Sequence, residues 1–157
     1  MDKKTMVLTA MIILASGALI NAYAAGTSSS SWGKEEQKNK AVVSLYDQGV
    51  EASKNNDYQR ALNLFQQALQ GDPNNPDILN MMAHAQLKLG RIDDSLETYK
   101  KALIIRPRFP QAREYLGEAY IQAALREIKI LRGYGSDANE NLEDLTGAFK
   151  EAAAGLE

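Results

Sequence analysis

The chain contains no cysteine. Disulfides, thiol catalysis, thiolate metal sites and lipid attachment at a leader cysteine are therefore excluded. Histidine is almost as scarce, because His84 is the only one in the sequence. A catalytic or metal site built on it would need more ligands, and the sequence has neither a Gly-rich phosphate loop nor a Ser/His/Asp set. We therefore predict that the chain is not an enzyme and that it holds no cofactor and no metal.

An excess of charge of one sign is also missing. The formal net charge of the 157 residues is −2, which gives no bulk attraction to nucleic acid or to anionic lipid. Hydrophobic residues make up 45% of the chain, enough for the packed core of one domain. One local group of cations has carboxylates nearby and no interleaved aromatic residues, so we interpret it as a solvated face (Lys100, Lys101, Arg106, Arg108 and Arg113).

The first residues have the three parts of a secretory signal peptide. Lys3 and Lys4 precede an uncharged, largely apolar run from Val7 to Ile20, and small residues follow at Ala22 and Ala24. We predict a signal peptide over residues 1–24, cleaved after Ala24. The alternatives are a buried helix, which would need an amphipathic face, and an uncleaved anchor, because the uncharged stretch just reaches the ~20 residues of a membrane span.

The compartment that this leader indicates is a bacterial periplasm. Secreted eukaryotic domains often contain disulfides or Asn-X-Ser/Thr acceptors, and this sequence has neither. Residues 25–40 include four consecutive serines and Trp32, and we expect them to form a flexible tether that becomes helical near Glu35. Two roles stay open for Trp32, which either packs on the first helix or anchors a partner.

The sequence repeats itself with a period of 34 residues. Small residues align with small ones and large residues with large ones, as in stacked units that bury a shared core. The aligned sets are Leu45 with Leu79; Gly49 with Ala83 and Gly117; Asn56 with Gly90; Tyr58 with Ile92; Ala61 with Ser95; Leu62 with Leu96; Phe65 with Tyr99; Ala68 with Ala102; and Pro73 with Pro107.

These residues resemble the tetratricopeptide repeat, through YDQGVEASKNNDYQRALNLFQQALQGDPNN and LNMMAHAQLKLGRIDDSLETYKKALIIRP. The resemblance implies an all-α fold, a short right-handed α-solenoid of helix pairs. We expect the repeat domain to cover residues 41–157, with repeats at 42–75 and 76–109 and a partial third repeat at 110–132. Asn56 and Gly90 suit the turn within each pair, because both residue types tolerate a left-handed backbone.

The third unit departs from the pattern. Its turn should fall at residues 123–125, yet these are strong helix formers, so we predict one fused helix from about Pro110 to Arg132. Gly133 and Gly135 then break it. A last amphipathic helix over residues 139–155 has Leu142, Leu145 and Phe149 on one face. We expect this helix to cap the open end of the solenoid; the alternative is a helix that docks on a partner.

The resemblance also implies a binding surface, because proteins of this family hold peptides on the concave face formed by their first helices. That surface would offer nine residues here: Tyr46, Val50, Lys54, Asn80, His84, Lys88, Glu114, Glu118 and Ile121. Tyr46 and Val50 replace groups of the clamp that binds a terminal carboxylate, so that activity is not carried over. We expect His84 and Glu118 to be neighbours.

The expected function is that of a scaffold or adaptor for a protein or peptide partner in the cell envelope. A structural subunit of a membrane-associated complex is the alternative, docked through its C-terminal helices or an uncleaved leader. An enzyme or ligand carrier is a third possibility, which would require a closed pocket.

Overall fold

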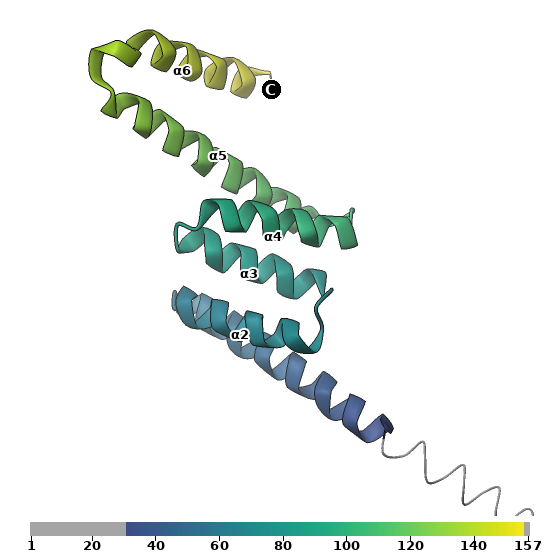
Figure 1. Cartoon of the computed structure of the whole chain (residues 1–157). Helices are drawn as coiled ribbons and strands as arrows, with labels where there is room; N and C mark the ends of the chain where they lie inside the picture. The colour runs from purple at the N-terminus through teal and green to yellow at the C-terminus, as the bar shows by residue number, and fades with distance from the viewer. Residues whose placement is uncertain (1–30, 156–157) are drawn as a thin grey trace, which may run out of the picture.

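The computed structural model describes residues 31–155 (Figure 1). The leader, its cleavage site and residues 25–30 of the expected tether lie outside them. Within residues 31–155 the chain is helical and has no strand. Its elements are a first helix (residues 31–54), α2 (Tyr58–Gly71), α3 (Pro76–Lys88), α4 (Ile92–Ile105), α5 (Pro110–Gly133), a 3-10 helix η1 (Gly135–Ala138) and α6 (Asn139–Ala154). None of these helices is both long and apolar enough to cross a membrane.

The first helix begins earlier than we expected from the sequence, within the segment predicted to be a flexible tether. Residues 31–40 are helical and exposed to solvent, although we expected them to be flexible up to about Glu35. An ion pair of 2.7 Å between Lys40 and Glu36 supports this segment, because oppositely charged residues four apart stabilise a helix. The Trp32 side chain is 74% exposed, so it does not pack closely on the first helix.

The turns and caps follow from particular residues. Asn56 has a φ of 61° and Gly90 a φ of 75°, the left-handed conformation expected at the two turns. The Asp57 side chain accepts a hydrogen bond from the backbone N–H of Arg60 and so caps α2. The Asn75 side chain caps α3 in the same way.

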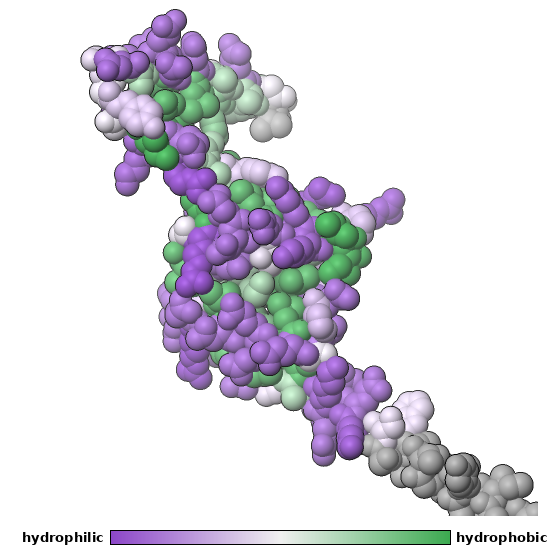
Figure 2. Space-filling model, in the orientation of Figure 1, coloured by the Kyte–Doolittle hydropathy of each residue, from purple (hydrophilic) through white to green (hydrophobic). Residues whose placement is uncertain are grey.

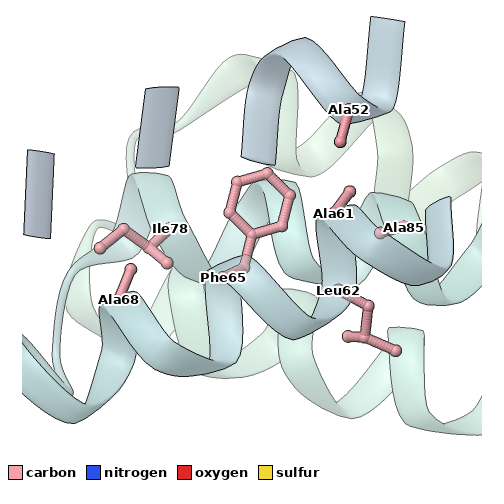
Figure 3. Close-up of a cluster of buried hydrophobic side chains, with 7 residues drawn as sticks. All are labelled: Ala52, Ala61, Leu62, Phe65, Ala68, Ile78 and Ala85. Atoms are coloured by element: carbon pink, nitrogen blue, oxygen red, sulfur yellow. The ribbon is translucent and has the colours of Figure 1, made fainter. Parts of the chain in front are cut away.

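The core lies between the two helices of each pair. The Phe65 side chain is fully buried and points from α2 toward the first helix (Figure 3). It lies against Gly49, where an added Cβ would come within 2.5 Å of Phe65 Cε1. In the next pair, the buried Tyr99 packs in a cluster with Ala83. Small residues at the paired positions therefore let aromatic rings fill the space between the helices.

The fused helix is confirmed, because α5 runs without interruption for 24 residues. Gly135, with a φ of 71°, turns the chain back after α5, and α6 returns along the outer half of α5 (Figure 1). In this outer half of α5, Ile128 is 9% exposed. However, no residue of α6 is buried and Phe149 is 37% exposed, so α6 covers α5 less closely than the expected cap. We call α6 together with the outer half of α5 (residues 122–133) the arm.

Candidate functional site

The nine residues expected to bind a partner lie on the first helix, α3 and α5, the first helices of the three units. We call their surface the first-helix face. At its beginning, the half-buried Tyr46 ring lies 6.0 Å from the Phe65 ring. Burial, and then Asp77 and Asp47, raise the pKa of Tyr46, so its hydroxyl stays protonated and available as a donor. A hollow of about 240 Å³ opens beside it, between the first helix and the start of α3.

Two other residues of the first helix are less available to a partner. Val50 is half-buried and packs against the core cluster around Phe65. A substitution there would disturb folding as well as binding. Lys54 is exposed, and its Nζ lies 3.7 Å from Glu51 on the same helix. It offers a solvated charge at the edge of the face.

Asn80 stands at the base of the face and is 1% exposed. Its Nδ2 donates to Gln111 Oε1 at 3.4 Å, and Gln111 Nε2 in turn donates to the Tyr115 hydroxyl at 3.3 Å. The Asn80 Oδ1 atom is buried and has no hydrogen-bond partner among the described residues. An acceptor of this kind is costly to leave unpaired.

His84 lies between two tyrosines. Its ring centroid is 6.1 Å from that of Tyr58 and 5.1 Å from that of Tyr115. Burial, and then the positive charge of Lys88, lower the pKa of His84 from its usual 6.5, while Glu118 opposes them. The imidazole is therefore neutral at pH 7. Its Nδ1 is buried without a partner among the described residues, so this side chain adds a second unpaired polar atom to the face.

A charged pair closes the upper rim of the face. Lys88 Nζ lies 3.1 Å from Glu118 Oε1, and the same oxygen accepts a hydrogen bond from Gln122 at 3.3 Å. The negative charge of Glu118 acts on His84, in line with the neighbouring positions that we expected. Glu114 is exposed. Ile121 lies apart from the group, because it lines a groove between α5 and α6.

The sequence did not reveal three side chains of this face: Tyr58, Gln111 and Tyr115. The repeat period of 34 aligns equivalent positions, but contacts between adjacent first helices join residues 30 or 31 apart. His84 and Tyr115 follow the same offset. Applying this offset to the sequence would have found Gln111 and Tyr115 from Asn80 and His84.

A second aromatic layer lies beneath the first. The Tyr99 ring is 6.2 Å from the Tyr115 ring, and its buried hydroxyl has no hydrogen-bond partner among the described residues. Burial raises the pKa of Tyr99. Among residues 31–155, no group of three or more His, Asp or Glu side chains is placed to hold a metal ion. The face offers polar atoms and aromatic surface for binding.

Known proteins share this architecture. The tetratricopeptide-repeat family model matches residues 52–113. Among solved structures, the first such repeat domain of Spaghetti (RPAP3), bound to the HSP90 peptide SRMEEVD, is 17% identical, with a TM-score of 0.54 over 71% of this chain and 94% of that one. The Sgt2 domain from Aspergillus fumigatus is 28% identical, with a TM-score of 0.53 over 74% of this chain and 83% of that one.

The curated relatives include the photosystem I assembly protein Ycf3 of Prochlorococcus marinus. The protein of strain MIT 9312 is 31% identical over 121 residues, which cover 75% of this chain and 65% of the relative. That of strain MIT 9215 is 33% identical over 87 residues, covering 54% and 50%. The chain thus spans less than two thirds of the length of these relatives. Residues 52–113, which include the helix pair α3–α4 and its small-residue contacts, are thus similar to the tetratricopeptide-repeat family.

Proposed function

We propose that this chain is a non-enzymatic adaptor that holds a segment of a partner protein on its first-helix face. The observation behind this proposal is the pair of buried, unpaired polar atoms at the base of the face, Asn80 Oδ1 and His84 Nδ1. His84 lies between the rings of Tyr58 and Tyr115, which supply apolar contact, and Asn80 is linked to Tyr115 through Gln111. A peptide segment offers the matching groups, because its backbone N–H groups donate hydrogen bonds and its side chains supply apolar surface.

The charged pair at the rim of the face indicates which kind of partner segment would fit. Lys88 and Glu118 already neutralise each other, so the face has no strong charge of either sign at its centre. A segment with mixed polar and apolar side chains fits it better than a highly charged one. The relatives support a protein partner: one solved structure is named for its bound HSP90 peptide, and the curated relatives are named as assembly proteins.

We place this adaptor in the periplasm, on the basis of the leader over residues 1–24. Intact mass of the chain recovered from the cell envelope tests this. A mature form that begins at Ala25 is expected, and a chain that still contains Met1 to Ala24 would favour the anchored alternative. The second candidate function, a structural subunit docked through its C-terminal helices, is favoured by the apolar groove on the arm.

Photo-crosslinking in the native envelope tests the first-helix face. A crosslinking residue at the exposed Glu114 should capture a partner protein, whereas one at the equally exposed Gln66 on α2 should not. Capture from both positions with equal yield, or from neither, would contradict the proposal.

A substitution at the base of the face tests the carrying observation. Asn80→Leu keeps the branched shape of the side chain but removes the unpaired acceptor, together with the Nδ2 donor to Gln111. Capture from Glu114 should therefore fall while the fold, followed by circular dichroism, is retained. Capture that Asn80→Leu leaves intact would mean that this oxygen makes no contact with the partner.

A further inference from the structure

The third unit lacks a packing partner that both earlier units have. Gly49, Ala83 and Gly117 are equivalent positions in the repeat. An added Cβ at Gly49 would meet the Phe65 ring at 2.5 Å, and Ala83 is fully buried in the cluster that contains Tyr99. At Gly117, an added Cβ would find nothing within 4 Å.

The residues beside Gly117 show the same difference. In the second unit, Gln86 is 9% exposed and Leu87 is 2% exposed. Their equivalents in the third unit, Tyr120 and Ile121, are 48% and 51% exposed. We call Gly117, Tyr120 and Ile121 the open face. It has the shape that receives a second helix in the other units, but it is uncovered.

The cause is the fusion of α5. Phe65 and Tyr99 each come 16 residues after the small residue that they cover, and the corresponding position in the third unit is Gly133. Gly133 is the last residue of α5, so the third unit has no antiparallel helix, and no aromatic ring, at the usual place.

The arm does not close this gap within one chain. On α6, Phe149 is 37% exposed, and a groove of about 380 Å³ stays open between α6 and Ile121 of the same chain, lined on the α6 side by Leu145, Ala148, Phe149, Ala152 and Ala153. Figure 1 shows the arm standing away from the body formed by α2, α3 and α4. In Figure 2 its apolar surface shows between hydrophilic side chains.

The α6 helix has the pattern that the open face requires. Phe149 and Ala152 are three residues apart, like Phe65 and Ala68 or Tyr99 and Ala102. The aromatic rings of the latter two pairs are the ones that pack with Gly49 and Ala83 in the first two units. The apolar side of α6 is therefore suited to cover an open face, but it leaves the open face of its own chain uncovered.

The charges of the two surfaces are complementary. The α6 helix has four acidic residues and one lysine: Glu140, Glu143, Asp144, Glu151 and Lys150. Beside the open face, two cations have no carboxylate within 4.0 Å among the described residues: Lys100 of α4, and Arg113 one turn before Gly117 on α5. Lys100 lies 5.6 Å from the Tyr120 ring, which puts a positive charge directly at the open face.

We propose that two copies of this chain form a dimer. In this dimer, α6 of each copy lies on the open face of the other, and Phe149 covers the second copy's Gly117. The contact is the same in both directions, as in a two-fold symmetric dimer. Of the nine residues of the first-helix face it covers Ile121, whereas those on the first helix and α3 stay free for the partner, so this proposal does not depend on the proposed function.

Sedimentation of the purified chain over a concentration series tests the dimer. Gly117→Trp fills the open face, and Phe149→Asp removes the ring that covers it. Each should raise the dimer dissociation constant at least about tenfold, as the loss of a central aromatic contact does. Gly33→Trp is the matched control, because Gly33 also has nothing within 4 Å of an added Cβ, and it should leave the dimer intact. A wild-type chain that stays monomeric throughout the series would overturn the proposal.

Disulfide trapping identifies the contact itself. Because the sequence has no native cysteine, only the introduced cysteines can form a disulfide. A Gly117→Cys chain mixed with a Phe149→Cys chain should give a disulfide-linked heterodimer under mild oxidation. The dimer should also weaken as salt is raised, since exposed charges are screened. A dimer that forms without the mixed disulfide, or that Gly117→Trp does not weaken, would show that the copies meet elsewhere.

Discussion

Replacing Gly49 and Gly117 by alanine should change stability in opposite directions, although both lie inside a helix at the same position of the repeat. An alanine in a helix interior is favoured over glycine by about 0.5–1 kcal/mol. At Gly117 the new methyl group meets nothing within 4 Å. Gly117→Ala should therefore stabilise the chain by about 0.5–1 kcal/mol.

At Gly49 the same gain is outweighed. The new Cβ would lie 2.5 Å from Phe65 Cε1 and 2.9 Å from two further ring atoms. Phe65 is fully buried, so its ring has no free space to move into, and overpacking of this kind costs about 1–3 kcal/mol. The net result for Gly49→Ala should be a loss of about 1–2 kcal/mol.

Urea denaturation followed by far-UV circular dichroism, at concentrations that keep the chain monomeric, measures both changes. Heating should show the same order, with shifts of about 3–5 °C for each kcal/mol in a domain of this size. A Gly49→Ala chain at least as stable as the wild type would refute the reasoning, because the Gly49–Phe65 contact would then not constrain the pair. Equal changes in stability at the two positions would show that the space beside Gly117 is not empty.

Three further predictions follow from the described contacts. Ala68→Leu and Ala102→Leu should each lower the free energy of unfolding by about 1–3 kcal/mol, because both residues are fully buried; denaturation midpoints measure this. Since the pKa of His84 is lowered in the folded chain, the unfolded chain binds more protons, and stability should fall as the pH drops below 6.5; His84→Gln should remove this part of the pH dependence. Truncation after Gly135 should cost only about 1–3 kcal/mol, the contribution of covering one large apolar residue such as Ile128, as measured by urea denaturation.

Each of these has a distinct contrary result. Unchanged midpoints for both leucine variants would place the helix contacts elsewhere. Parallel stability curves of wild type and His84→Gln below pH 6.5 would show that His84 is not protected from protonation. A truncated chain that is unfolded would mean that α6 stabilises the repeats far more than its exposed side chains indicate.

The helix pairs and their contacts could be predicted from the sequence, because the period of 34 residues aligns small residues at the positions where helices touch. The fused α5 could also be predicted, since residues 123–125 offer no turn former. The helical start of the first helix could not. Serines and Gly33 favour a tether locally, whereas helix propagation from the stable region adds one hydrogen bond for each residue ordered.

The candidate site was less accessible to sequence reasoning. Repeat positions identify which residues share a face, and Asn80 and His84 were found in this way. They do not give the offset between neighbouring helices, which decides that His84 contacts Tyr115. The loose packing of α6 on α5 was not predictable either. An amphipathic stripe shows which side of a helix is apolar, but not how closely the neighbouring helix approaches.

The exposure of Trp32 has a consequence for anyone who follows the folding of this chain optically. As the only tryptophan, 74% exposed in the first helix, it sits in water before the repeats unfold and remains there afterwards. Its emission should therefore report fraying at that end of the helix and little of the core, since local opening can precede global unfolding. A mismatch between tryptophan fluorescence and circular dichroism would then reflect the position of the fluorophore, and should not be counted as evidence for a folding intermediate.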